Sequence, residues 1–374
     1  MLVDVQSGIR ILASEPPPVD PEHARLLHTI AAVGDRSHAS DELAAAASGD
    51  DALRPHLSAA RANLLLPLEL QPARTALHVR CGAGALTRSL GEAGWRVVAL
   101  EPSLGLARAA AARCEDLPDV EVVCGGAREY DAGDGVDLVL AEDVDAVDVL
   151  DIARALRPDG VLVLAVDNPL GLRRLVAADG QADLAAWSTH APMADRRRLR
   201  QVLVDHGLVA QRWLFPYPDH RLPTDVADEA LFARDDAAEV VLKFVTADAR
   251  TAPRALLEAG LGADLASSFL VVAASSGAVV EAATRPGLLW HASVDRRPTW
   301  RRARVVSPEN GHLVIAPVSQ DGSRVAQLGW LRQQVDEPQR ILRGGVVGRE
   351  MLDAAADRDL ERLRRLLVEY HQLV

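Results

Sequence analysis

The chain has 374 residues and a formal net charge of −12. Such an acidic chain lacks the basic surface that sequence-independent nucleic-acid binding requires, and no run approaches the eighteen apolar residues of a membrane span. Lys243 is the only lysine, which excludes a Schiff-base or phosphate-gripping lysine at any other position. The three cysteines lack CxxC spacing and the eleven histidines form no HxxxH pattern, so no disulfide framework and no metal site are predicted.

Residues 1–54 are rich in Pro, Asp and Ala, with one helical pattern at 23–33. We predict an N-terminal helical extension. The first residues lack the basic flank and apolar core of a secretory signal, and with no disulfide pattern a cytoplasmic location is expected.

Short Val/Leu runs alternate with helical patterns between residues 75 and 166. The predicted strands are 75–79, 96–100, 120–124, 136–141 and 161–166, and the predicted helices between them include 103–114 and 146–156, the latter ended by a turn at RPDG (157–160). This alternation is typical of strand–helix–strand crossovers. It predicts an α/β fold with a Rossmann-like, doubly wound, mostly parallel sheet.

The alternation loosens after residue 167. We expect a helix at 194–206, a strand at 208–215, a proline-rich loop at 216–223 and a strand at 267–274. From about 285 the pattern changes to short strands, and an amphipathic helix follows at 349–373. We therefore predict one domain at 55–280 and a small α+β appendage at 281–374.

The segment TALHVRCGAGALTRSL (75–90) reads as a strand, a glycine turn and a helix start. Gly82 and Gly84 allow the backbone to approach a ligand, and Glu101 at the end of the next strand is placed to accept hydrogen bonds from ribose hydroxyls. Together they predict a site for an adenosine-containing cofactor. The third glycine that a dinucleotide site requires is replaced by Thr87. This replacement favours S-adenosylmethionine as the cofactor and disfavours an NAD-linked oxidoreductase, which stays open as an alternative function.

Several segments resemble class I S-adenosylmethionine-dependent methyltransferases. Beside the glycine turn, these are HLSAARANLLLPLEL (56–70), ALEPS (99–103), LRPDGVLVLAVDNPLGLRRL (156–175), FPYPDHRLP (215–223) and LASSFLVVA (265–273). Together they are similar to a bacterial group of methyltransferases associated with glycosyltransferases of surface-polysaccharide synthesis. Some members of this group carry a kinase-like region after the methyltransferase, and WHASVDRRPTWRRARVV (290–306) resembles the start of that region. The resemblance implies a methyltransferase domain at 55–280, a glycan or other small-molecule acceptor methylated on oxygen, and a glycosyltransferase as candidate partner. The appendage is expected to be a kinase-like remnant without kinase activity, because no lysine follows Lys243.

The chain departs from that group in its first motif. His78 replaces an acid that helps to organise the amino end of the cofactor, and Arg80 replaces the first glycine. We expect His78, Arg80, Gly82, Gly84 and Glu101 to contact the cofactor. Losing the charge of the acid would cost about 1.5–3 kcal/mol, whereas Arg80 would either reach the cofactor's carboxylate or repel its sulfonium.

Other candidate site residues follow the fourth and fifth strands of the domain. Glu142 and Asp143 are expected near the transferred methyl group, with Glu142 beside the cofactor and solvated loop acids as the alternative for both. Asp167 and Asn168 are predicted to bind substrate, with a helix cap as the alternative role of Asn168.

Asp219 and His220, in the proline-rich loop, form the predicted acid/base pair, because a histidine held by a carboxylate can take a proton from a hydroxyl. Packing of the loop around a solvated histidine is the alternative. Two functions follow from these residues: a methyltransferase acting on a glycan hydroxyl, or a non-catalytic methyltransferase-like subunit with a decayed cofactor site.

Overall fold

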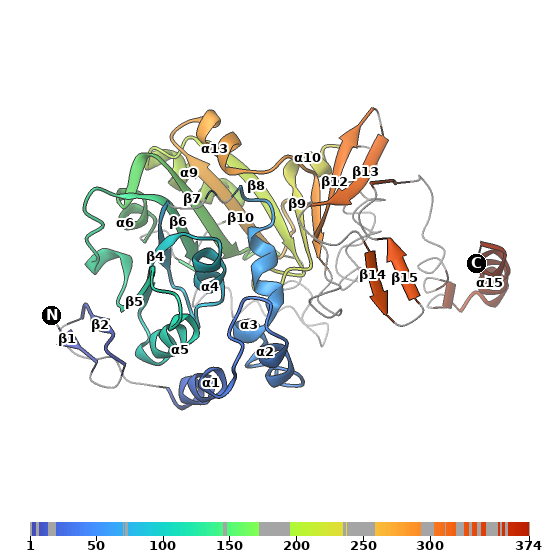
Figure 1. Ribbon diagram of the computed structural model, residues 1–374. Helices are drawn as coiled ribbons and strands as arrows, with labels where there is room; N and C mark the ends of the chain where they lie inside the picture. The colour runs from blue at the N-terminus through green and yellow to red at the C-terminus, as the bar shows by residue number, and fades with distance from the viewer. Residues whose placement is uncertain are drawn as a thin grey trace.

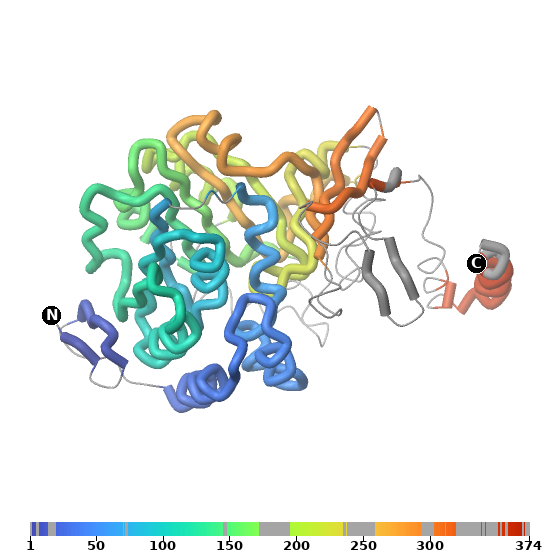
Figure 2. Tube along the Cα trace, in the orientation of Figure 1, coloured from blue at the N-terminus to red at the C-terminus, as the bar shows by residue number. Residues whose placement is uncertain are grey.

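Figures 1 and 2 show the computed structural model of the chain. It describes residues 2–4, 7–13, 20–69, 71, 74–144, 148–171, 195–234, 237, 259–292, 303–310, 312–318, 325–328, 331–334, 338–341, 351, 354–355 and 358–373.

The described strands are β1 (Leu2–Val3), β2 (Arg10–Ile11), β3 (Thr75–Val79), β4 (Arg96–Glu101), β5 (Val120–Cys124), β6 (Val136–Glu142), β7 (Leu156–Asp167), β8 (Ala210–Tyr217), β9 (Asp225–Asp228), β10 (Ser268–Ala274), β11 (Leu289–Ala292), β12 (Ala303–Glu309), β13 (His312–Pro317), β14 (Val325–Leu328), β15 (Leu331–Gln334) and β16 (Gln339–Arg340). The described helices are α1 (Pro21–Ala32), α2 (Asp41–Ala46), α3 (Arg54–Leu57), α4 (Ala85–Glu92), α5 (Leu104–Cys114), α6 (Asp148–Arg154), α9 (Arg196–Asp205), α10 (Glu229–Phe232), α13 (Gly277–Ala283) and α15 (Leu360–Leu373), with the 3-10 turns η1 (Ala59–Leu65) and η2 (Ala127–Glu129).

One sheet runs through most of the described chain. Its order is β1-β2-β5-β4-β3-β6-β7-β10-β8-β9-β11-β12-β13-β16, and β14 and β15 form a separate pair. Strands β3 to β7 are parallel, whereas β10 runs antiparallel between β7 and β8. The chain order reverses between β3 and β6, which is the switch point where doubly wound sheets bind their ligands outside the carboxyl ends of the strands. The predicted Rossmann-like α/β fold is confirmed.

Helices cover both faces of the central sheet (Figure 1). On one face, α4, α13 and η1 contribute Leu86, Leu90, Val280, Leu64 and Leu65 to a core with inward residues of β6, β7 and β10. On the other face, α6, α9 and α10 contribute Val149, Ile152, Leu199, Leu203 and Leu231. The parallel strands are thus buried on both sides, which explains their nearly continuous Val/Leu runs.

The predicted strands of the central sheet match β3 to β7 closely at their carboxyl ends. The prediction of a turn at RPDG (157–160) was wrong, because β7 begins at Leu156 and includes these four residues. Helices α1 and α2 lie within the predicted N-terminal extension, and α3 begins at its last residue. Strand β2 pairs with β5 and so adds an unpredicted strand beside the parallel strands.

The region after residue 280 mixes strands and helix. Strand β11 pairs with β9 and with β12, so the main sheet runs across the predicted boundary at 280. The final helix is described from Leu360, within the predicted range. Lys243 and the segment 175–194 lie outside the described residues, as does most of 290–306. No helix within the described ranges combines the length and apolarity needed to cross a bilayer.

Candidate active site

The glycine turn joins β3 to α4. Gly82 has φ 56° and Gly84 has φ 76°, a left-handed conformation that favours glycine. A Cβ atom on Gly84 would lie 3.0 Å from the Cα of Ala110, so α4 also needs this glycine to approach α5. Arg80 has φ 57° and therefore keeps the backbone conformation of a glycine although it carries a long side chain.

A pocket of about 600 Å³ lies at the carboxyl edge of the sheet, beside this turn. It is lined by Pro55, His56, Arg61, Arg80, Cys81, Gly82, Ala83, Ala85, Glu101, Pro102, Ser103, Leu106, Glu142, Asp143 and Arg221. The pocket is thus lined by the predicted residues of the glycine turn and of β4, by the carboxyl end of β6, and by Arg221 of the 216–223 loop. Its position at the switch point is where a doubly wound sheet binds a ligand.

Glu101 ends β4 and faces this pocket. Its Oε2 accepts a hydrogen bond of 2.9 Å from the N–H of Gly82, and its Oε1 accepts one of 2.9 Å from the N–H of Ser103. Burial raises the pKa of Glu101, against these two hydrogen bonds. A carboxylate has about four acceptor positions, so two remain for the hydroxyls of a ribose.

His78 is fully buried at the end of β3. Its Nδ1 lies 2.8 Å from the hydroxyl of Thr87 and its Nε2 lies 3.2 Å from Oε1 of Glu142. His78 does not line the pocket in which we expected it to contact a cofactor, whereas Glu142 does. Glu142 also pairs with Arg61.

Arg80 lies at the mouth of the pocket and is exposed. Its Nη1 donates a hydrogen bond of 2.8 Å to the carbonyl oxygen of Asp143, which holds the guanidinium against the turn that follows β6. The side chain therefore spans the ends of β3 and β6 and, like Glu101, lines the pocket.

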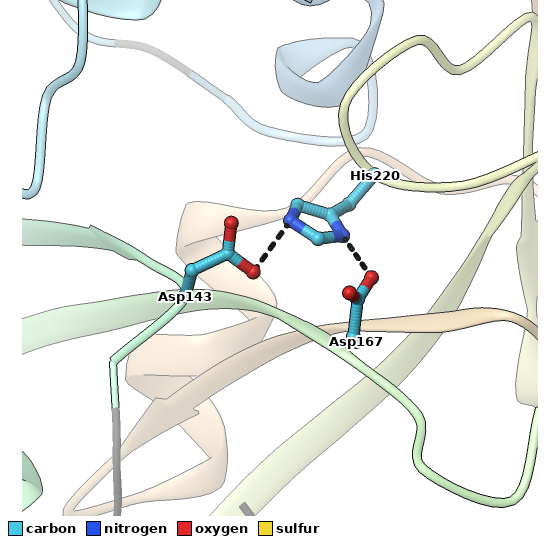
Figure 3. A group of neighbouring side chains, drawn as sticks. All are labelled: Asp143, Asp167 and His220. Carbon is cyan, nitrogen blue, oxygen red and sulfur yellow. Dashed lines mark ion pairs between the residues drawn. The ribbon is translucent and has the colours of Figure 1, made fainter. Parts of the chain in front are cut away.

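His220 lies between two carboxylates (Figure 3). Its Nε2 is 3.1 Å from Oδ1 of Asp143 and its Nδ1 is 3.4 Å from Oδ1 of Asp167, while the Ser268 hydroxyl lies 3.1 Å from Nδ1. Arg221 bridges the same two carboxylates at 2.6 Å and 3.0 Å. Burial would raise the pKa of Asp143, but His220 and the charge of Arg221 outweigh it and lower that pKa.

The atoms of Asp143, Asp167 and His220 that could bind a metal lie within 4.8 Å of one another. Oxygen and imidazole ligands of this kind suit several divalent cations. Arg221, however, already supplies a positive charge to both carboxylates. A cation would have to displace this guanidinium, so we assign the cluster to an arginine-neutralised network.

The predicted pair, Asp219 and His220, lies in the 216–223 loop. Oδ1 of Asp219 accepts hydrogen bonds from the N–H groups of Arg221 and Leu222, at 2.9 Å and 3.1 Å, which fixes the turn of the loop. The His220 ring itself lies beside Asp143 and Asp167, which come from the ends of β6 and β7.

Asn168 is buried and makes its contacts away from the pocket. Its amide donates hydrogen bonds of 2.8 Å and 2.7 Å to the carbonyl oxygens of Asp264 and Ala266, and its Oδ1 accepts one from Leu170. These contacts anchor the end of β7 to the segment before β10. Asp167, by contrast, faces His220 and Arg221.

Sequence reasoning missed His56 and Arg61, which line the pocket from the segment before the sheet. Burial, helped by the charge of Arg61, lowers the pKa of His56 to about 4, so this imidazole is neutral at pH 7. Arg61 pairs with Glu142 and donates a hydrogen bond of 3.2 Å to the carbonyl oxygen of Arg221. Both residues lie in 56–70, which the resemblance covers, but no local pattern marks them as site residues.

The comparison with protein-family models matches one part of the chain. Residues 76–160 match the family model described as a methyltransferase domain. A search of curated proteins finds no match.

The solved structures that resemble the chain share little sequence with it. A phosphoethanolamine N-methyltransferase 2 of Haemonchus contortus in complex with S-adenosyl-L-methionine is 16% identical with a TM-score of 0.38, over 57% of this chain and 51% of that one. A possible histamine N-methyltransferase of Thermotoga maritima is 14% identical with a TM-score of 0.39, over 59% and 91%. A geranyl diphosphate methyltransferase in complex with sinefungin is 17% identical with a TM-score of 0.38, over 69% and 100%. The chain spans about half the length of the Haemonchus contortus protein.

The match over 76–160 runs from β3 through the start of β7, and so covers the glycine turn, Glu101 and the end of β6. Over residues 76–160 the chain therefore carries a methyltransferase domain.

Proposed function

We propose that the protein transfers a methyl group from S-adenosylmethionine to a hydroxyl oxygen of a glycan or glycan precursor. The pocket beside the glycine turn carries the proposal, because it joins the turn, Glu101 and a polar cluster at the switch point of the sheet. The glycan rests on the resemblance of the segments between 56 and 306 to polysaccharide-associated methyltransferases. That resemblance also implies a glycosyltransferase as partner, a kinase-like origin of 281–374 and work in the cytoplasm.

The pocket fits the cofactor chemically. Glu101 offers its free acceptor positions to the ribose hydroxyls, and the left-handed glycines bring the backbone close to the ligand. The bound cofactor would supply a methyl group on a positively charged sulfur. Arg80, at the pocket mouth, would reach the carboxylate of its amino-acid part.

Methyl transfer to a hydroxyl leaves a proton to be removed. Asp143 lines the pocket next to His220 and Arg221, and we assign it the acceptance of this proton. The oxygen becomes strongly acidic as the methyl group arrives, so a carboxylate of lowered pKa is a sufficient base. His220, buried behind Asp143, positions it, and alignment of donor and acceptor supplies the rest of the rate.

Calorimetry with S-adenosylmethionine and S-adenosylhomocysteine tests the cofactor part of this proposal. We expect saturable micromolar binding that Glu101→Ala weakens by at least about 100-fold, since two charge-assisted hydrogen bonds are lost. The absence of heat at millimolar ligand would identify a non-catalytic methyltransferase-like subunit. Transfer of a labelled methyl group to a panel of nucleotide sugars and oligosaccharides then tests the acceptor, and labelling of none of them refutes the glycan.

A further inference from the structure

The buried polar group around His78 has a feature that the sequence does not display. His78 stands where the related methyltransferases have an acid, yet a carboxylate is present within hydrogen-bonding distance. Oε1 of Glu142 lies 3.2 Å from Nε2 of His78. Both side chains are buried, and Glu142 is the one that lines the pocket.

The strand register explains why Glu142 arrives there. Strands β3 and β6 are parallel neighbours, and His78 is the register partner of Leu140. Side chains two residues apart on a strand point to the same face, so Glu142 and Leu140 share a face with His78. Glu142 also lies two residues nearer the carboxyl edge, which brings its carboxylate to the wall of the pocket.

Hydrogen-bond chemistry assigns the ring nitrogens of His78. An ionised carboxylate only accepts, so Nε2 carries the hydrogen and donates it to Glu142. In the neutral ring Nδ1 then accepts from the hydroxyl of Thr87, 2.8 Å away. His78 can therefore orient Glu142 without carrying a charge of its own.

Arg61 holds the other oxygen of the same carboxylate. Its guanidinium comes from η1, on the face of the sheet that α4 covers, and it also donates to the carbonyl oxygen of Arg221. Burial would raise the pKa of Glu142, but Arg61 and His78 outweigh it and hold that pKa well below its usual value. Glu142 is thus a fixed anion with acceptor positions left over, because two partners use about half of a carboxylate's capacity.

We propose that Glu142 supplies, from β6, the carboxylate that the first motif has lost at His78, and that it binds the amino group of the cofactor's methionine part. This inference rests on the proposed function. His78 is then a positioning residue, and the acid of the site has moved to the neighbouring strand rather than disappeared.

The first experiment compares two ligands by calorimetry. S-adenosylhomocysteine carries the amino-acid part, whereas 5′-methylthioadenosine has the same adenosine and thioether without it. For Glu142→Gln we expect the Kd of S-adenosylhomocysteine to rise about 10- to 100-fold, as for the loss of one charge-assisted hydrogen bond, and the Kd of methylthioadenosine to stay within about twofold.

Asp137→Asn is the matched control. Asp137 lies on the same strand at its opposite end, and its carboxylate pairs with Arg157 as that of Glu142 does with Arg61. The control should leave both Kd values within about twofold. Equal weakening of both ligands by Glu142→Gln would overturn the proposal, because it would mean that Glu142 only shapes the pocket; unchanged binding would overturn it as well.

The second experiment returns the carboxylate from position 142 to position 78. His78→Glu places two carboxylates side by side and should lower the Tm by about 5 °C or more. His78→Glu combined with Glu142→Gln has one carboxylate again, and should recover the Tm and bring the Kd of S-adenosylhomocysteine to within about threefold of the natural protein. A double variant that binds no better than Glu142→Gln refutes the exchange of roles.

The two experiments separate this inference from the proposed function. If the natural protein does not bind S-adenosylhomocysteine, the proposed function fails and the inference fails with it. If the natural protein binds and the variants depart from the pattern above, the inference alone fails.

Discussion

Replacing Gly84 by alanine tests how tightly the turn after β3 is built. Gly84 has φ 76° and precedes the first residue of α4. An added Cβ would lie 3.0 Å from the Cα and 3.1 Å from the Cβ of Ala110 in α5. The substitution therefore imposes both a left-handed conformation on alanine and a steric overlap with a neighbouring helix backbone.

The two costs have separate magnitudes. The left-handed conformation costs a non-glycine residue about 1–2 kcal/mol. Overpacking against a backbone that cannot move aside adds about 1–3 kcal/mol. We therefore expect Gly84→Ala to lower the free energy of unfolding by about 2–5 kcal/mol, a large part of the stability of an ordinary domain.

Gly82→Ala is the control for this measurement. Gly82 has φ 56°, but the nearest atom to an added Cβ is Nδ1 of His56 at 3.9 Å, an ordinary contact. Only the conformational cost applies, so we expect a loss of about 1–2 kcal/mol. Urea unfolding of both variants gives the two values, and equal losses would refute the close approach of α4 to α5.

Three further predictions concern the pocket. His56 has a pKa of about 4 in the fold against 6.5 ordinarily, so its neutral ring contributes about 3 kcal/mol of stability above pH 6.5, and this contribution is lost as the pH falls toward 4. In urea unfolding across this pH range, the free energy of unfolding of His56→Asn should therefore depend less on pH than that of the natural protein. The same pH dependence in both proteins would count against the burial of a neutral ring. Asp143→Asn should lower kcat by about 100-fold or more in steady-state assays while the Kd of S-adenosylhomocysteine changes less than threefold, and a normal kcat would exclude Asp143 as the base. Arg80→Gly should raise the Kd of S-adenosylhomocysteine about 10-fold or more in calorimetry and leave that of 5′-methylthioadenosine within about twofold, because the contact with the cofactor's carboxylate is lost; an unchanged Kd of S-adenosylhomocysteine would show that the guanidinium does not hold this carboxylate.

The central sheet could be predicted because its signal is local. Runs such as 120–124 and 136–141 are apolar at nearly every position, and Gly82, Gly84 and Glu101 lie at strand ends that such runs define. Since parallel strands bring their carboxyl ends to one edge, the meeting of the turn with Glu101 follows from the order of strands.

The contacts around His78 could not be predicted in the same way. The pairing of His78 with Glu142 depends on β3 and β6 being neighbours in a given register, and the sequence alone specifies neither. The contribution of Arg61 depends on where η1 packs. The His220 network likewise joins three segments, so the approach of Asp143 and Asp167 to the His220 ring could not be predicted from neighbours in the sequence.

The two strands at the amino end of the N-terminal extension were missed for another reason. Strand β2 has two residues, too few for a pattern of alternation to show, and it exists because β5 offers an open edge. Edge pairing of this kind depends on the partner strand rather than on local propensity.

The continuity of the sheet beyond residue 280 affects how the protein can be divided. Strand β9 pairs with β8 on one side and with β11 on the other, and the amide of Asn63 donates to the carbonyl oxygen of Pro223, just ahead of β9. Cutting the chain at 280 would strip β11 from β9 and leave unsatisfied backbone groups along a newly bared strand, a template for aggregation. The methyltransferase domain and the segment that follows it should accordingly be expressed together, and we expect them to unfold in one cooperative transition.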